Sequence, residues 1–202
     1  MGGWVLAVVV AAIVVAVAVL VVTDDRGGTH VAAVGDSVTY LSAGVLQERF
    51  DWADRFDVQA RPGFRTDQLV PVAEDLLADG PDALVLLTGY NDILQLADPE
   101  AGLQLMVEVA TRAPCAVWML VPVKGDYDRA SMEAYNTRLE ELTRPVSTIH
   151  LSPAWRDVVD APEGPDPSSD LISTDRVHPT DAGSRILAEA MEAAVRRECL
   201  PS

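Results

Sequence analysis

The feature that most constrains the fold is a regular alternation of two kinds of segment along the chain. Five short runs are strand candidates, namely 30–34, 57–60, 83–88, 116–121 and 146–151. Most of them are continuous β-branched or aliphatic runs, as expected of strands covered on both faces. Five amphipathic stretches alternate with them, namely 41–50, 66–78, 99–112, 130–142 and 181–197. Strand–helix repeats of this kind pack as helices on both faces of a parallel sheet. We therefore expect an α/β protein, a three-layer α/β/α sandwich with a five-stranded parallel sheet.

A different kind of segment precedes this domain. The chain carries no charged residue from Trp4 to Val22, a run long enough to cross a bilayer as a helix. We expect residues 1–28 to be a transmembrane anchor with a polar linker, and residues 29–202 to be one domain outside the cytoplasm. The alternative is a cleaved signal peptide, because Ala16-Val17-Ala18 fits a cleavage site, and the protein would then be secreted.

Composition narrows the range of partners. The formal net charge of −16 argues against nucleic acid as a partner and against electrostatic binding to anionic lipid headgroups. Membrane contact is therefore expected only through the N-terminal helix. The sequence does not indicate an oligomeric state.

Three short strings carry the chemistry. Gly35-Asp36-Ser37 follows the first strand-like run, Gly89-Tyr90-Asn91-Asp92 follows the third, and Asp175-Arg176-Val177-His178-Pro179 precedes the last amphipathic stretch. Parallel sheets bind ligands beyond the carboxyl ends of their strands. The first two strings are therefore expected at the same rim of the sheet.

A serine hydroxyl becomes a good nucleophile only when an oriented base removes its proton. Among the three histidines, His30 opens a strand at the wrong edge, and His150 lies inside a strand-like run where packing is the simpler role. His178 lies in a loop three residues after Asp175, so one turn can bring the carboxylate to its ring. We expect Ser37 as the nucleophile, His178 as the base and Asp175 as its partner.

The tetrahedral intermediate also needs donors for its oxyanion. Asn91 offers a side-chain amide at a strand end, and Gly63 is a glycine between a strand and a helix, where its N–H can approach a substrate closely. The N–H of Ser37 is the third candidate.

Residues near these strings have two interpretations each. The arginines could bind a substrate carboxylate or phosphate, or neutralise neighbouring aspartates; they are Arg61, Arg65 and Arg176. The aromatic residues could line an acyl or sugar pocket, although core packing is the default; they are Phe64, Tyr90 and Trp155.

The two cysteines bear on the compartment. Cys115 precedes a strand and Cys199 ends the last amphipathic stretch, so both are expected at the edge of the sheet opposite the candidate site. Two free buried thiols and a disulfide are both compatible with this placement, and the disulfide requires an oxidising compartment.

The ordered strings resemble those of the SGNH hydrolases (GDSL esterases and lipases) over roughly residues 30–197. The first block matches Gly35-Asp36-Ser37, the third matches 89–92, and the last matches 175–179; Gly63 takes the place of the second-block glycine. Many relatives place a threonine two residues after that glycine, whereas Thr66 stands three after it. The resemblance implies a flavodoxin-like fold and hydrolysis of carboxylic esters or thioesters without a metal or organic cofactor.

The leading hypothesis is thus a serine esterase that acts on a small-molecule, lipid or glycan ester through an acyl-enzyme. One alternative keeps the site but makes the protein an acyltransferase or deacetylase of cell-envelope glycans or lipids. A non-catalytic binding module is the other, and the intact serine, histidine and aspartate argue against it.

Overall fold

A computed structural model of the chain describes residues 28–123, 129–161 and 170–200. No helix in these ranges is both long and apolar enough to cross a membrane. The predicted transmembrane segment, 4–22, lies outside the described residues.

A five-stranded sheet forms the centre of the domain, and its strand order is β2-β1-β3-β4-β5. The strands are β1 (His30–Gly35), β2 (Arg55–Ala60), β3 (Ala83–Leu87), β4 (Ala116–Met119) and β5 (Ile149–Ser152). Every neighbouring pair is parallel, which confirms the predicted sheet. This is the flavodoxin-like order, in which the chain changes direction between β1 and β3.

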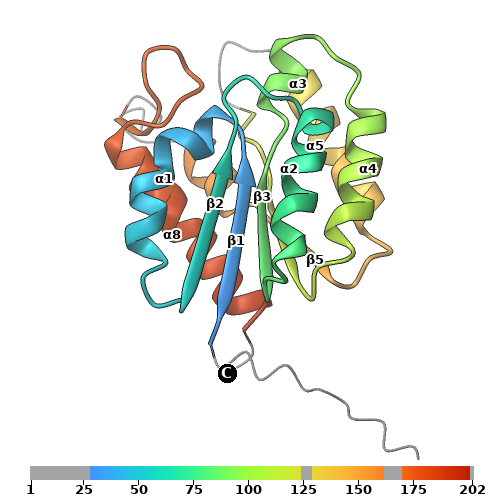
Figure 1. Ribbon diagram of the computed structural model, residues 1–202. Helices are drawn as coiled ribbons and strands as arrows, with labels where there is room; N and C mark the ends of the chain where they lie inside the picture. Colours follow the sequence, from blue (N-terminus) through green and yellow to red (C-terminus); the bar gives the residue numbers. More distant parts are fainter. Residues whose placement is uncertain (1–27, 124–128, 162–169, 201–202) are drawn as a thin grey trace, which may run out of the picture.

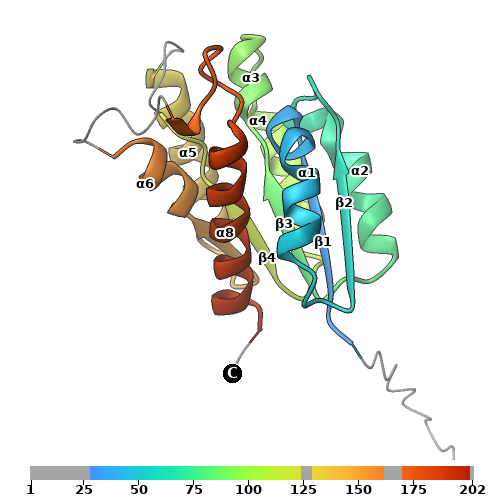
Figure 2. The same ribbon diagram turned by 90° about the vertical axis from the view of Figure 1, so that its left-hand side faces the viewer.

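Helices cover both faces of the sheet, as the three-layer prediction requires (Figure 1). One layer contains α1 (Ser37–Arg49) and α8 (Asp181–Glu198), which lie side by side, with α6 (Ala154–Val159) next to α8 (Figure 2). The other contains α2 (Thr66–Ala78), α4 (Glu100–Ala110) and α5 (Arg129–Thr143). A short helix, α3 (Tyr90–Leu94), follows β3 at the edge to which the strand arrows point.

The core consists of the aliphatic strands and the inner faces of these helices. The strand residues Val31, Leu84 and Val117 are fully buried, as expected of a sheet covered on both faces. Tyr90 and Trp155 are also buried, and the Trp155 indole N–H donates to the Tyr90 hydroxyl at 3.3 Å. Both aromatic residues therefore pack in the core rather than line a substrate pocket.

Two elements begin three or more residues away from the sequence-based expectation, for local reasons. The first helix begins at Ser37 rather than at residue 41, because the Asp36 carboxylate accepts a hydrogen bond from Val38 N at 2.9 Å and caps it. The last strand begins at Ile149 rather than at residue 146, because the Val146 and Ile149 N–H groups bond back along the chain in turns.

A disulfide joins Cys115 to Cys199, with 5.5 Å between their Cα atoms. Cys115 directly precedes β4, and Cys199 is the C-cap of α8. The disulfide therefore lies at the edge where the strands begin, near the C-terminal end in Figure 1. The predicted placement of the two cysteines is confirmed, and the alternative of two free thiols is wrong.

Candidate active site

Ser37 is held at the switch point of the sheet. It is the first residue of α1, two residues beyond the end of β1, and is half-buried. The helix packs so closely on the end of the strand that a Cβ on Gly35 would collide with the side chain of Thr39. Its position at a helix N-terminus also places Ser37 where backbone N–H groups favour negative charge.

His178 reaches Ser37 from the loop before α8. Its Nε2 lies 2.8 Å from Ser37 Oγ, and its Nδ1 lies 2.7 Å from Asp175 Oδ2. The structure thus joins the three residues expected to act together in one hydrogen-bonded chain, although Ser37 and His178 are 141 positions apart in sequence.

The loop that carries His178 is fixed at both ends. An isolated antiparallel bridge pairs Ile172 with Pro179, and Ser173 N donates to His178 O at 2.7 Å. Arg176 adopts a left-handed backbone with φ of 60°, which turns the chain between the aspartate and the histidine. Thr180 then caps α8 by accepting from Gly183 N at 3.1 Å.

Asp175 organises the loop as well as the imidazole. Its Oδ1 accepts from Ser173 Oγ at 2.7 Å, Val177 N at 2.9 Å and His178 N at 3.0 Å. Partial burial alone would raise the pKa of this carboxyl, but these bonds and the one from the ring outweigh it and hold the pKa well below its ordinary value. Asp175 is therefore an anion that keeps the proton on Nδ1 and leaves Nε2 free to accept from the serine.

Asn91 lies beside these residues, at the start of α3, and is buried. Its Nδ2 donates to Phe64 O at 3.1 Å and lies 3.5 Å from Asp36 Oδ2. Asp36, immediately before Ser37, is fully buried, and burial raises the pKa of its carboxyl to about 7. Asn91 thus connects the residue before the candidate nucleophile with the loop that contains Gly63.

Gly63 lies in the loop between β2 and α2, where its φ of +80° is one that glycine adopts readily. Its carbonyl accepts from Gln95 Nε2 at 2.7 Å, and Arg65 Nη1 donates to Gln95 Oε1 at 3.2 Å. These bonds fix the loop against the end of α3. No contact joins Gly63 directly to Ser37 or His178 among the described residues, so its place is adjacent to the hydrogen-bonded chain rather than in it.

A buried network behind Asn91 was missed by sequence reasoning. Asp92 Oδ2 accepts from Thr66 N at 3.0 Å and from Thr66 Oγ1 at 2.8 Å, so it caps α2 from another element. The Tyr135 hydroxyl bonds both Thr66 Oγ1, at 3.0 Å, and Thr88 Oγ1, at 2.9 Å. Burial raises the pKa of Asp92. The only available signal was the position of Asp92 next to Asn91 in the string 89–92.

The remaining histidines take part in other contacts. His30 Nε2 lies 2.8 Å from Asp57 Oδ2 at the start of the sheet, and His150 Nδ1 lies 3.3 Å from Glu198 Oε2. His178 is thus the one histidine of the chain that reaches the serine. Among the described residues, no group of three or more His, Cys, Asp or Glu side chains is arranged as metal ligands.

Two flanking arginines are occupied by neighbours. Arg65 pairs with Asp67 at 3.0 Å, and Arg61 Nη1 donates to Ala60 O at 3.2 Å. For Arg65 the neutralising interpretation therefore fits better than substrate binding.

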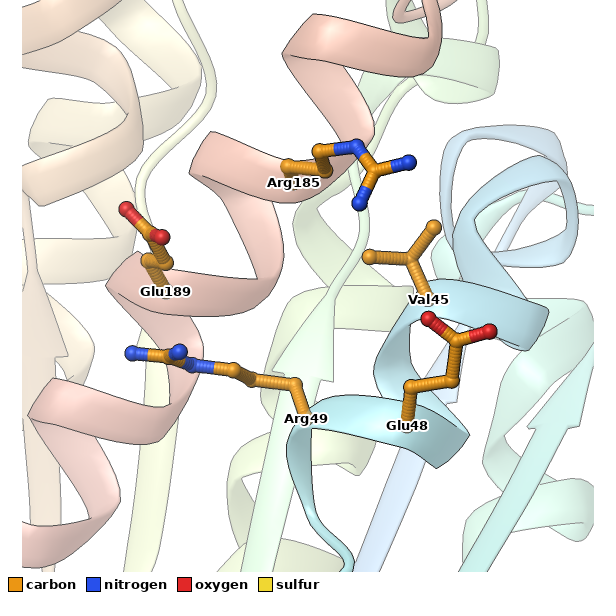
Figure 3. Close-up of a pocket in the computed structure, with 5 residues that line it drawn as sticks. All are labelled: Val45, Glu48, Arg49, Arg185 and Glu189. Atoms are coloured by element: carbon orange, nitrogen blue, oxygen red, sulfur yellow. The ribbon is translucent and has the colours of Figure 1, made fainter.

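A hollow on the outer face lies between α1 and α8 (Figure 3). Its walls carry charges of both signs; they are formed by Val45, Glu48, Arg49, Arg185 and Glu189. These residues lie further along α1 and α8 than Ser37 and Thr180, on the side of the domain. The hollow is therefore separate from the candidate active site.

Comparison with known proteins places these features in a family. A model of the GDSL-like Lipase/Acylhydrolase family matches residues 25–186. A search of curated proteins found no match.

Solved structures share the fold at low sequence identity. TesA has a TM-score of 0.68 at 19% identity, over 83% of this chain and 98% of TesA. The psychrotrophic esterase EstA from Pseudoalteromonas sp. has a TM-score of 0.65 at 15% identity, over 83% of this chain and 96% of that chain. Axe2-W215I, an acetyl xylan esterase from Geobacillus stearothermophilus, has a TM-score of 0.63 at 21% identity, over 85% of this chain and 96% of that chain. The chain belongs to the GDSL-like lipase/acylhydrolase family of SGNH hydrolases and is an ester-hydrolysing serine hydrolase.

Proposed function

We propose that the protein cleaves carboxylic esters, or thioesters, through an acyl-enzyme on Ser37, with His178 as general base and Asp175 as its partner. The observation that carries this proposal is the hydrogen-bonded chain from Ser37 Oγ through the His178 ring to Asp175, with contacts of 2.8 and 2.7 Å. These three hydrogen-bonded residues lie at the carboxyl-end edge of the strands, where parallel sheets bind their ligands.

In the first half-reaction Ser37 Oγ attacks the ester carbonyl carbon while Nε2 of His178 takes the hydroxyl proton. The ring then carries a positive charge, which the Asp175 carboxylate stabilises through Nδ1–H. Collapse of the tetrahedral intermediate breaks the bond to the alcohol, and His178 returns its proton to the departing oxygen.

The oxyanion of that intermediate is held by Ser37 N–H, Gly63 N–H and the Asn91 amide. Two observations support this set: Ser37 N lies at a helix N-terminus, and Asn91 is bonded to the loop of Gly63 through Phe64 O at 3.1 Å. A single donor of this kind is worth about 10²–10³ in kcat.

In the second half-reaction water attacks the acyl-enzyme, again with His178 as the base. Solvent access supports hydrolysis over transfer to another alcohol, because the side chains of His178 and Asp175 are 31% and 51% exposed. An acyltransferase would require a site that excludes water and admits a second alcohol. The complete serine, histidine and aspartate set also disfavours a non-catalytic binding module.

We place the domain, residues 29–202, outside the cytoplasm, anchored by an N-terminal helix within residues 1–28. The disulfide between Cys115 and Cys199 supports an oxidising compartment. The chain enters the domain at His30, where β1 begins, and Ser37 follows the other end of that strand, about 20 Å away for six residues. An anchored domain would then present its site away from the anchoring bilayer, which favours esters in the surrounding envelope, such as acetylated glycans, over lipids of that bilayer.

The test uses purified full-length protein and a panel of p-nitrophenyl esters from acetyl to palmitoyl, together with acetylated sugars. Ser37→Ala is expected to lower kcat at least about a thousandfold and to abolish labelling by a fluorophosphonate. The matched control is Ser147→Ala, which removes an exposed serine hydroxyl just before β5. It should hydrolyse and label like the wild type.

Ser37→Ala activity near that of the wild type would overturn the assignment. Product analysis with sugar acceptors separates the two activities, because an acyltransferase would form an acylated sugar where a hydrolase forms the free acid. Membrane fractionation tests the anchor, and a fully soluble mature chain starting near Val19 would contradict it.

A further inference from the structure

Asp36 is a buried carboxyl group next to the nucleophile that the mechanism above does not use. Its side chain is fully buried, and Oδ1 accepts from Val38 N at 2.9 Å, so one oxygen is explained by the cap of α1. Oδ2 faces Asn91 Nδ2 at 3.5 Å, the long limit of a hydrogen bond. Serine, asparagine and aspartate cap helices about equally well, so the cap alone does not require a charged side chain in a buried place.

Asn91 explains what the second oxygen can do. A side-chain amide has two hydrogens, and in the free protein one is directed at Phe64 O and the other at Asp36 Oδ2. To stabilise an oxyanion, the amide must give up one of these acceptors. The contact with Asp36 is the longer and weaker one, so it can be exchanged while the 3.1 Å bond to Phe64 O keeps the amide plane in place.

Asp36 also lies where such an exchange is useful. It immediately precedes Ser37, and its second oxygen therefore directs the Asn91 hydrogen toward the region beside the nucleophile. The titratable groups His178 and Asp92 both interact electrostatically with Asp36. His178 already has its own carboxylate partner at 2.7 Å, whereas Asn91 has no other acceptor on this side among the described residues.

We infer that Asp36 is a positioning residue of the reaction, which holds one N–H of Asn91 in the direction of the oxyanion and releases it when the oxyanion forms. The inference rests on the proposed function. It assigns to Asp36 an effect on kcat that passes through Asn91, and no contact with the substrate.

The experiment compares three single substitutions in the full-length protein, assayed on the best ester of the panel. Asp36→Ser keeps a cap oxygen for Val38 N but removes the acceptor for Asn91, and it should lower kcat about tenfold with KM nearly unchanged. Asp36→Asn also keeps the cap, but its amide nitrogen would face the amide nitrogen of Asn91. Two donors repel, so this isosteric change should lower kcat further than serine does, by about a hundredfold. Asn91→Ala should lower kcat by about 10²–10³.

The double variant Asp36→Ser/Asn91→Ala separates positioning from other roles. If Asp36 acts through Asn91, replacing Asp36 should not lower kcat further once the Asn91 amide has been removed. The kcat of the double variant should then match that of Asn91→Ala within about threefold. A further tenfold loss would show that Asp36 acts on another group, such as His178, and would overturn the inference.

A role as a helix cap alone predicts a different pattern, in which both Asp36 variants keep kcat within twofold of the wild type. That result would also overturn the inference. If Asp36→Ser fails to fold, Asp36→Asn alone and combined with Asn91→Ala gives the same decision, since it keeps the cap and the volume. Wild-type hydrolysis that survives Ser37→Ala would instead overturn the proposed function, and the inference with it.

Discussion

The ring of Tyr135 lies so close to Gly89 that a Cβ on the glycine would come within 2.6 Å of ring carbons Cε1 and Cζ. Gly89 also has a φ of +119°, a backbone conformation that other residues rarely adopt. This contact seats the start of α3, and therefore Asn91, against the buried hydroxyl network of Thr66, Thr88 and Tyr135. Gly89 is thus required for both conformation and space.

Gly89→Ala is expected to destabilise the protein by about 2–4 kcal/mol, because backbone strain and overpacking against Tyr135 add together. The matched control is Gly44→Ala on the exposed side of α1, where a new Cβ meets nothing within 4 Å. It should raise stability by up to about 1 kcal/mol, since alanine favours a helix interior over glycine. Urea unfolding measures both, and equal midpoints for the two variants would contradict the role given to Gly89.

The layered fold was predictable because its signals are local. All five strands were predicted, most of them from continuous aliphatic runs, and amphipathic spacing predicted α2 with the same bounds, Thr66–Ala78. The short helices α3 and α6 were missed, since five or six residues are too few to establish a helical period. The start of α1 was misplaced because the cap comes from the Asp36 side chain, and apolar spacing carries no signal for a cap.

The residues of the candidate site were predictable from the sequence, but the contacts that hold them in place were not. Elimination among three histidines led to His178, which the structure places 2.8 Å from Ser37 Oγ. The bond between Asp92 and Thr66 could not be foreseen, because the two residues are 26 positions apart and each has an ordinary local role as a capping residue. Sequence identifies which groups can react, whereas the contacts that hold them depend on how the loops meet.

Asp175→Asn should lower kcat by about 10²–10⁴, the range for removing the carboxylate of such a triad. The asparagine can keep the acceptor for Val177 N and His178 N, but its amide nitrogen would face Nδ1 and favour the wrong ring tautomer. The control is Asp157→Asn. Asp157 is exposed on α6, and among the described residues its carboxylate pairs only with the neighbouring Arg156. Steady-state kinetics with unchanged kcat for Asp175→Asn would contradict the tautomer argument.

Leu96→Gly should stabilise the protein by about 1 kcal/mol, because Leu96 occupies the left-handed position after α3 that favours glycine. Its φ is 52° and its side chain is 91% exposed, so little burial is lost. The backbone closes the helix there with bonds from Leu96 N to Ile93 O at 3.1 Å and from Ala97 N to Asp92 O at 2.9 Å. Leu105→Gly, inside α4, should instead destabilise by about 1 kcal/mol or more. Urea midpoints that shift in the same direction would refute the prediction.

Replacing both Cys115 and Cys199 by serine should lower stability by about 4–5 kcal/mol, since the disulfide closes a loop with a sequence separation of 84. The kcat of the folded protein should change little, because the bond lies at the edge of the sheet opposite Ser37. Thermal melting of the wild type with and without reductant provides an independent measurement. Two alkylatable thiols in the native protein would contradict the disulfide.

Asp36 makes stability depend on pH in a direction opposite to that of a paired carboxylate. Burial raises its pKa from 3.8 to about 7 in the folded protein. Below pH 3.8 the carboxyl is protonated in both states, so folding does not bury a charge. Between pH 3.8 and about 7 the unfolded chain releases the proton while the folded protein keeps it. The free energy of unfolding therefore falls as pH rises, by on the order of 4 kcal/mol in total, and stays reduced above pH 7.

Asp36→Asn cannot ionise and still offers an oxygen to Val38 N, so it should be more stable than the wild type at pH 8 and nearly equal to it at pH 4. Urea unfolding of both proteins at pH 4, 6 and 8 measures the difference, in which the titration of carboxyl groups that do not interact with Asp36 cancels. A difference that does not change with pH would mean that Asp36 is not buried as an acid. The same variant is expected to lose activity through Asn91, so a gain in stability at pH 8 together with a loss of kcat would show that the buried charge is retained for catalysis at a cost in stability.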